Sequence, residues 1–394
     1  MKSPFYKTNN TVSAGSDNQL DQLTVIILRF TLVAWAVAKL SCYKLWLSTR
    51  IFPIVSPINL GFTFPDWVST SLLFASLSMM LALFILPRKL LFLVLLFFFE
   101  ILSCGIDETR WQAWEYHYLL MSVIFIINWK HKKKIIGLIA ILLACTYIYS
   151  GIFKINSVFV TEFWQNSVLH KLLHFSKYFV RRDIVHNAGY SLPIIEALGG
   201  LFFLFKRTRK VGVILLILMH LFTLIVIGPT GLNYNSTVWP WNLVMIVYLY
   251  LIGIKLKDIP FNTIISKKSL LNLCILVLLI LMPALNFIGL WPHFFSFCLY
   301  SFKAKQLMIT VNEESLAAKE LSPYFEKGWP VNLADNDNPQ FIVHNWAFKE
   351  MNTPAFPEVG YYEKVKVILL RKYPNAGLRF YLFEAQNPNY VELK

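Results

Sequence analysis

Acidic residues are scarce in this sequence, with 22 Asp and Glu against 37 Lys and Arg in 394 residues. Charged residues of both signs make up only 15% of the chain, whereas hydrophobic residues make up 56% and include 33 Phe. This balance excludes an ordinary soluble globular protein. A membrane-spanning helix needs about 20 mostly apolar residues, and the chain contains many such runs. The composition therefore predicts a polytopic membrane protein.

Paired cysteines and the common catalytic motifs are also missing. The five cysteines are scattered and no CxxC spacing occurs, so the sequence predicts no disulfide framework, thiol-redox motif or zinc site. The chain has no Walker loop, no GxGxxG after a strand, no HExxH and no nucleophile elbow. His170 and His174 lie four residues apart, but no third ligand is near them. We therefore expect no metal site.

The positive charge lies in the apolar part of the chain. Residues 293–394 hold 11 Lys and Arg and 11 Asp and Glu, so the net charge of +15 comes from the residues before them. A basic excess confined to the membrane part favours a topology signal over nucleic-acid binding. We expect contact with membrane lipid and none with nucleic acid.

The apolar runs and the basic residues between them predict an orientation. Basic residues follow every even-numbered run, including "KHKKK" at 130–134 and "KRTRK" at 206–210, whereas the odd exits are acidic or neutral. The positive-inside rule then places the N-terminus inside and the C-terminus outside the plasma (inner) membrane. The nine predicted spans are 23–47, 67–86, 90–106, 116–129, 135–153, 192–205, 211–228, 239–254 and 270–288.

The predicted fold is an all-α polytopic bundle of about nine transmembrane helices, followed by a small α+β domain outside the membrane. Residues 1–22 form a polar tail, 23–292 the membrane domain and 293–394 the extracytoplasmic domain. Residues 154–189 mix apolar and basic side chains, which is typical of an amphipathic segment on the outer interface.

The last hundred residues change character. There, "KQLMITV" and "LRFYLFEA" predict strands, whereas "FIVHNWAFKEM" and "YYEKVKVILLRKY" predict helices.

Polar residues gather in loops that this topology places on the outer face. The stretch "DETRWQAWEYHY" at 107–118 combines Arg110, Glu115 and His117 with Trp114 and Tyr116. Such a stretch is either an interfacial aromatic belt with local ion pairs or the wall of a binding site.

Three further polar groups stand inside or at the end of apolar runs. Lys154 in "YSGIFKI" is either an interface anchor or a desolvated lysine that accepts a proton. His220 in "LMHLFTL" is either a satisfied structural group or a catalyst. Arg29, Glu100 and Glu196 each need a partner in another span, which the sequence does not identify.

Several of these stretches resemble the horizontally transferred transmembrane (HTTM) domain, the membrane part of vitamin K-dependent γ-carboxylase. "LTVIILRFTLVAWAV" is similar to its opening helix with an internal arginine, here Arg29. "YSGIFKI" resembles its small-Gly-x-x-Lys motif, and "LMHLFTL" resembles its histidine-bearing helix. The resemblance covers roughly residues 20–290 and implies a pocket for a lipid quinone. It places Lys154 where the carboxylases keep their proposed base.

Two functions follow from these observations. The first is a quinone-linked enzyme that modifies a peptide or protein at the outer face. In it, Lys154, His220 and His117 are catalytic, and Arg110, Trp114 and Tyr116 bind the cofactor. However, about 100 residues cannot replace the large lumenal domain of the carboxylases. The alternative is a non-enzymatic scaffold, or a maturation, export or immunity factor, that binds a secreted or membrane partner.

Overall fold

The structure is a computed structural model of the chain. It describes residues 9–393 apart from 59–63, 257, 265–268, 327–337 and 386–389, with only the backbone over 9–17. Residues 1–8 of the predicted polar tail therefore lie outside the described residues, and residues 9–22 form the start of the first helix.

Each of the nine predicted spans coincides with a helical segment in the described part of the chain. Among the described residues, six segments are long and apolar enough to cross a membrane, and α3 and α4 are shorter apolar helices. The chain is thus a polytopic helical membrane protein. The bundle helices are α1 (Asn9–Ser41), α2 (Asp66–Ile85), α3 (Leu90–Ile106), α4 (Ala113–Ile127), α5 (Lys132–Lys154), α9 (Ser191–Leu204), α10 (Arg209–Ile227), α11 (Trp239–Tyr248) with the π-helical η5 (Leu249–Ile254), and α12 (Leu270–Ile280) with the 3-10 helix η7 (Met282–Ile288).

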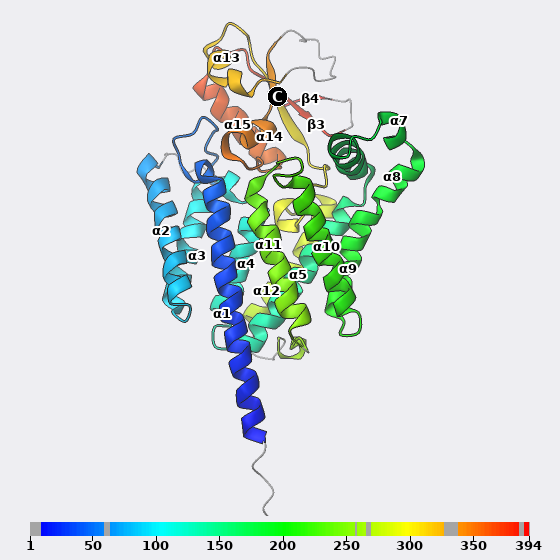
Figure 1. Cartoon of the computed structure of the whole chain (residues 1–394). Coiled ribbons are helices and arrows are strands. Elements are labelled where there is room, and N and C mark those ends of the chain that lie inside the picture. Colours follow the sequence, from blue (N-terminus) through cyan, green and yellow to red (C-terminus); the bar gives the residue numbers. More distant parts are fainter. Residues whose placement is uncertain are drawn as a thin grey trace, which may run out of the picture.

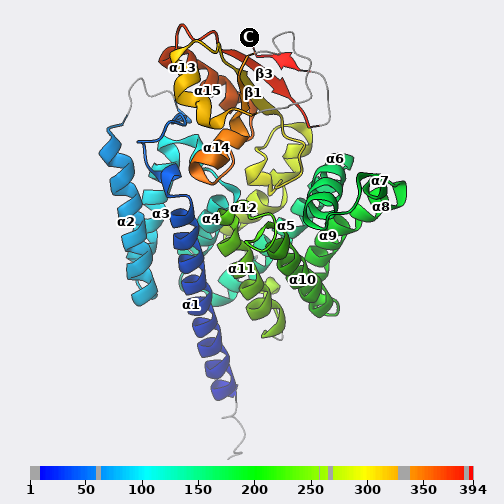
Figure 2. The same cartoon turned by 45° about the horizontal axis from the view of Figure 1, so that its top comes forward.

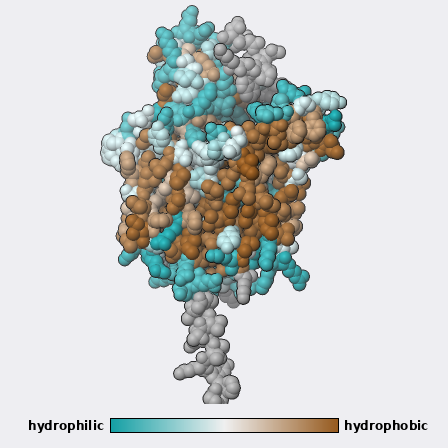
Figure 3. Space-filling model, viewed as in Figure 1, coloured by the Kyte–Doolittle hydropathy of each residue, from teal (hydrophilic) through white to brown (hydrophobic). Residues whose placement is uncertain are grey.

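An apolar belt surrounds this bundle. Figure 3 shows hydrophobic side chains over the middle of the molecule and hydrophilic ones at both ends of the bundle. Large apolar side chains of the outer helices are exposed, as at Phe74 in α2 and Ile225 in α10. A belt of this kind is stable in lipid and unfavourable in water.

Helix α5 lies at the centre and packs along α9. Within the apolar stretch of α5 that could span the membrane, 78% is buried inside the protein, against 28% within that of α2. Glycine permits close packing on both sides of α9: a Cβ at Gly200 would lie 2.8 Å from Cβ of Tyr147 in α5, and one at Gly212 of α10 would lie 2.7 Å from the Gly199 carbonyl oxygen. Small residues let membrane helices approach in this way because the lipid supplies little driving force for association.

The connecting segments lie mostly at the end of the bundle that carries the C-terminal domain (Figure 1). The predicted interfacial segment 154–189 is divided into short helices, with exposed Leu173, Tyr178 and Ile184 beside its basic residues. The short connecting helices are η1 (Tyr43–Trp46), η2 (Glu108–Arg110), α6 (Ser157–Phe159), the π-helical η3 (Val160–Leu172), α7 (Lys177–Val180), α8 (Asp183–Gly189), η4 (Ser236–Val238), η6 (Phe261–Thr263) and η8 (Phe294–Ser296).

The C-terminal domain is a four-stranded antiparallel sheet with helices, in the strand order β2-β1-β3-β4. The predicted strands are β1 and β3. The prediction of a helix from Phe341 is wrong at its start, because Phe341 and Ile342 pair with Ile309 and Met308 as strand β2. The elements are β1 (Gln306–Thr310), α13 (Leu316–Leu321), η9 (Ser322–Tyr324), β2 (Gln340–Ile342), α14 (Val343–Met351), α15 (Val359–Lys372), β3 (Arg379–Phe383) and β4 (Val391–Glu392).

The C-terminal domain is docked onto the bundle. Figure 2 shows α14 and α15 above the ends of α1 and α4, and the buried side chains of both parts form one continuous cluster. Glu350 of α14 accepts hydrogen bonds from the backbone N–H groups of Ile51, at 2.5 Å, and Phe52, at 3.0 Å. Lys364 of α15 pairs with Glu108 at 2.6 Å. The start of α1 protrudes at the opposite end (Figure 1).

Candidate functional site

Lys154 is the last residue of α5, and it forms an ion pair inside the protein. Its Nζ lies 2.8 Å from Oε2 and 3.1 Å from Oε1 of Glu196 in α9, and it also donates to Ser150 Oγ at 2.8 Å. The two charged side chains are only 12% and 8% exposed. Lys154 is therefore held by a carboxylate of the neighbouring helix and does not extend freely to the headgroup region.

The small residues before Lys154 allow this pairing. A Cβ at Gly151 would lie 2.6 Å from the Ala197 nitrogen and 2.7 Å from the Pro193 carbonyl oxygen, so only glycine permits α5 and α9 to approach so closely. Ser150, one turn before Lys154, lies on the same helix face and supplies a hydroxyl. The pattern "SGIFK" is thus explained by helix packing and one ion pair.

His220 belongs to a buried hydrogen-bonded chain that links α5, α10 and α11. Asn242 Nδ2 donates to the Val238 carbonyl, so its Oδ1 accepts from His220 Nδ1 at 2.8 Å. In a neutral imidazole the other nitrogen accepts, so Tyr147 donates to Nε2 at 2.7 Å. Both ring nitrogens of His220 therefore have hydrogen-bond partners. This is what is expected of a structural group, which was the alternative to a catalytic histidine.

A small cavity lies beside the ion pair. Its volume is about 70 Å³, and Lys154 and Glu196 supply its charged wall. Ligand pockets usually measure about 300–1,000 Å³, so this cavity admits a small group and not a whole lipid molecule. The other residues that line it are Phe159, Phe163, Leu192, Pro193, Met219, Phe222, Thr223, Ile227 and Tyr300.

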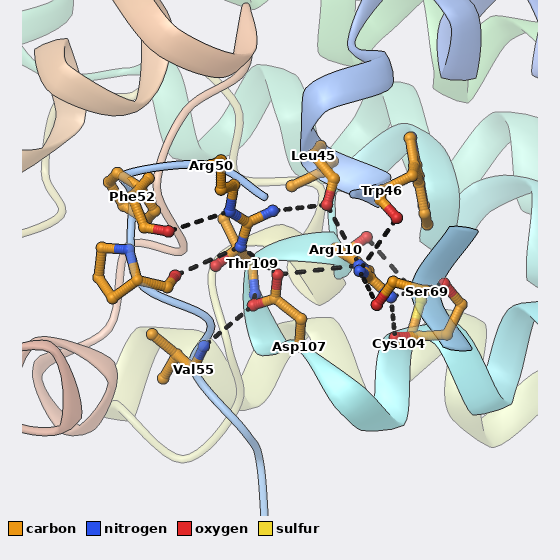
Figure 4. Close-up of polar contacts among 12 residues, drawn as sticks. Leu45, Trp46, Arg50, Phe52, Val55, Ser69, Cys104, Asp107, Thr109 and Arg110 are labelled. Carbon is orange, nitrogen blue, oxygen red and sulfur yellow. Dashed lines mark hydrogen bonds and ion pairs between the residues drawn. The ribbon is translucent and has the colours of Figure 1, made fainter. Parts of the chain in front are cut away.

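Arg110 lies in a different polar network, under the C-terminal domain (Figure 4). Its guanidinium donates to three carbonyls, those of Leu45, Trp46 and Ser103, and to two hydroxyls. Asp107 lies 3.8 Å away and also pairs with Arg50. Burial lowers the pKa of Arg110 to about 10, so it stays charged at neutral pH. These bonds fix the turns that carry the C-terminal domain.

Trp114, Tyr116 and His117 are packed inside the protein. The Tyr116 ring stacks on Phe295 with the centroids 4.6 Å apart, and His117 lies 5.7 Å from the ring of Trp241. Trp114 packs edge-to-face on Trp46, with centroids 6.2 Å apart. No described contact joins any of these three residues to Lys154 or His220. The predicted site residues therefore fall into two groups.

Sequence reasoning missed Lys39, which pairs with Glu100. Lys39 Nζ lies 2.7 Å from Glu100 Oε2, and neither side chain is more than 1% exposed. Arg29, the partner considered for Glu100, donates instead to the Phe84 carbonyl at 3.0 Å. The available signal was Lys39 itself, a lysine within the first predicted span.

Comparison with known families matches residues 132–237 to the family described as methylamine utilisation protein MauE. The match begins at the first residue of α5 and ends in η4, so it contains Lys154, Glu196, Tyr147 and His220. Neither the curated proteins nor the solved structures give a match. The chain is therefore similar to a membrane family over less than half of its length.

The resemblance to the HTTM domain is wrong, because the family that matches is MauE. The misleading motifs were short. In this chain, the glycine followed three residues later by a lysine is explained by the tight packing of α5 on α9 beside an ion pair.

Proposed function

We propose that this chain is a non-enzymatic accessory factor of the membrane, which binds a secreted or membrane protein through its C-terminal domain and supports the maturation of that protein. Two observations support the proposal. The matched family is named for methylamine utilisation, and the C-terminal domain is a fixed platform on the bundle. The docking of that domain carries the argument.

The docking contacts are buried or half-buried and polar, which makes the platform rigid. Thr109 and Tyr361 share a 2.8 Å hydrogen bond between hydroxyls, and Gln112 donates to the Pro354 carbonyl at 2.9 Å. Asn352 donates to the Ser41 carbonyl and to Ser236 Oγ. Separating the domain from the bundle would break these hydrogen bonds and expose the apolar side chains of the shared cluster to water, which is costly. A domain held in this way presents one surface in one orientation to a partner.

In the proposed topology the N-terminus is inside and the C-terminal domain is outside the plasma (inner) membrane. The basic loops after α2, α4, α9 and η5 support it, because such loops stay on the inside. The start of α1 and the C-terminal domain also lie at opposite ends of the bundle (Figure 1).

A second candidate function is the binding of a lipid quinone beside Lys154. The observation that favours it is the cavity with an ion pair on one wall and aromatic side chains around it. In this reading Lys154 assists a redox step beside the cavity. The other predicted site residues do not line the cavity, and they are His220, His117, Arg110, Trp114 and Tyr116. The cavity would have to widen to admit the ring.

One pair of substitutions separates the two functions. Lys154→Met with Glu196→Leu removes both charges and keeps the volume of the site similar, so the fold should persist. An accessory factor carrying this double substitution should still support its partner, whereas a quinone-linked enzyme should be inactive. Mass spectrometry of co-purified lipids, in wild type and in the double variant, tests the quinone directly.

The partner is found by photo-crosslinking from the outer domain. A photoreactive residue at Leu316 of α13 or Val367 of α15, both exposed, should crosslink to one protein in intact cells. The same residue at Leu270 of α12, an exposed bundle position, should crosslink only to lipid. Deleting this chain should then lower the amount of the mature form of that protein. If the partner matures normally without the chain, the accessory role is excluded.

A further inference from the structure

The bundle contains a second group of charges that the proposed function does not use. It comprises Lys39 near the end of α1, Glu100 in α3 and Glu115 in the first turn of α4. All three residues are fully buried. These helix ends face the C-terminal domain (Figure 1). Ionisable groups buried in a membrane bundle are expensive and usually mark a functional site.

The geometry divides the three groups into a pair and a third member. Lys39 Nζ lies 2.7 Å from Glu100 Oε2 and 3.0 Å from the centre of the Trp46 ring. Glu115 Oε2 accepts a hydrogen bond from Trp35 Nε1 at 2.7 Å, and the carboxyl is within electrostatic range of Lys39 and Glu100. Glu115 Oε1 and Glu100 Oε1 have no hydrogen-bond donor among the described residues, and the two carboxyls lie close enough to interact directly.

One ammonium faces two carboxyls here, which leaves one negative charge unbalanced if both carboxyls are ionised. A buried carboxylate with one oxygen unpaired is strongly unfavourable in a medium of low dielectric constant. Two interacting carboxyls avoid the second negative charge by holding one proton between them, as coupled acids do.

The neighbouring groups do not supply the missing positive charge at close range. The other titratable side chains that act on the cluster are Cys42, Cys104, Tyr118 and Arg110. Thiols and phenols are neutral at neutral pH. Arg110 forms its ion pair with Asp107, and no described ion pair joins Arg110 to Glu100 or Glu115. Because Arg50 also pairs with Asp107, Arg110 is the nearby cation among the described residues that could balance the cluster from a distance, and the infrared spectrum of the wild type tests this.

We propose that Lys39, Glu100 and Glu115 form an intramembrane proton-binding site, in which the two carboxyls together hold one exchangeable proton. The ligand of this site is a proton. Because the charge of Lys39 balances one ionised carboxylate, only one of the two carboxyls needs a proton. The site is distinct from the Lys154–Glu196 pair, which balances one positive charge with one negative charge.

Isotope-edited infrared spectroscopy of the purified full chain tests this proposal. The wild type at neutral pH should show the carbonyl stretch of one protonated glutamic acid. That band should shift when glutamate is labelled with carbon-13 and when the solvent is D₂O, which separates it from lipid ester bands. It should disappear at alkaline pH.

The variants give three different expected results, because each changes the charge balance. Glu115→Gln and Glu100→Gln should each remove the band, since one carboxylate then balances Lys39. Lys39→Met should double its intensity, since both carboxyls must then be protonated. Glu196→Gln, outside the cluster, should leave the band unchanged.

Two outcomes would overturn the proposal. The first is the absence of the band in the wild type at neutral pH, which would mean that the charge of Arg110 balances the cluster. The second is a band that survives in both glutamine variants. The absence of the band in the wild type overturns the proposal even if a variant fails to fold, and either glutamine variant that folds is enough to assign the band to the cluster.

Discussion

Gly151 of α5 lies against the backbone of Ala197 in α9, so closely that a Cβ at Gly151 would stand 2.6 Å from the Ala197 nitrogen. One turn further along, Lys154 and Glu196 pair across the same two helices. The glycine and the ion pair therefore depend on one close helix contact, and this contact lies within the segment that is similar to the MauE family.

Gly151→Ala should weaken the protein. The added methyl meets the backbone of α9, and overpacking of this kind costs about 1–3 kcal/mol. The measurement is the thermal unfolding midpoint in detergent. Gly105→Ala is the matched control, because a Cβ at Gly105 meets nothing within 4 Å. Equal midpoints for the two variants would show that the α5–α9 contact is looser than described.

Lys154→Met alone should destabilise the protein more than Lys154→Met combined with Glu196→Leu. The single change leaves a buried carboxylate without its partner, which costs about 3–5 kcal/mol, whereas removing both charges costs much less. A double-mutant cycle on unfolding midpoints measures the difference. Lys206→Ala, which breaks an exposed pair with Asp258, should cause no measurable change. If the effects of the two single substitutions add up to the effect of the double substitution, Lys154 and Glu196 do not form a stabilising ion pair.

Tyr147→Phe should destabilise the bundle by about 1–3 kcal/mol, because Nε2 of buried His220 would lose its donor. Tyr178→Phe, at a residue that is 80% exposed, serves as the control for removing a tyrosine hydroxyl. Unfolding midpoints and hydrogen exchange in α10 report the effect. If α10 exchanges at the wild-type rate in Tyr147→Phe, the hydrogen-bonded chain is not a stabilising element.

Glu350→Gln should loosen the docking of the C-terminal domain. The carboxylate accepts from two backbone N–H groups and from Trp346 Nε1, and hydrogen bonds to a charged group contribute about 1.5–3 kcal/mol. We expect faster amide hydrogen exchange at Ile51 and Phe52. Glu384→Gln, at an exposed position, should leave their exchange unchanged, and protection that persists in Glu350→Gln would argue against a fixed platform.

His344 should make the C-terminal domain less stable in acid. Burial lowers its pKa to about 4 in the folded state, against about 6.5 in the unfolded chain. Between these values the unfolded state binds the proton and the folded state does not, so stability falls as the pH decreases from about 6.5 to about 4. The slope is at most about 1.4 kcal/mol per pH unit.

The measurement for His344 compares unfolding of wild type and His344→Gln across that pH range. The ring of His344 packs edge-to-face on Phe348, with the ring centroids 4.9 Å apart, and the residue is half-buried. The difference between the two proteins isolates the histidine from the carboxylates that also titrate. If the difference in stability between wild type and His344→Gln does not change with pH, the lowered pKa of His344 is refuted.

Local sequence patterns were sufficient to predict much of the fold. Apolar runs such as 90–106 coincide with helix α3 to the residue, because a span needs a continuous apolar segment. The short stretches "KQLMITV" and "LRFYLFEA" were predicted as strands and form β1 and β3. The start of "FIVHNWAFKEM" was misjudged because the pairing of Phe341 and Ile342 with β1 depends on a strand about 30 residues away.

The sequence by itself determined the class of the protein, the positions of its apolar helices and the need for partners at Glu100 and Glu196, since these follow from composition and from the cost of charge in lipid. Only the tertiary structure decided the partners. Lys39, not Arg29, meets Glu100, and Glu196 meets Lys154. The reason is physical: the rotation and spacing of packed helices determine which side chains meet, and those depend on small residues such as Gly151 on both sides of each contact.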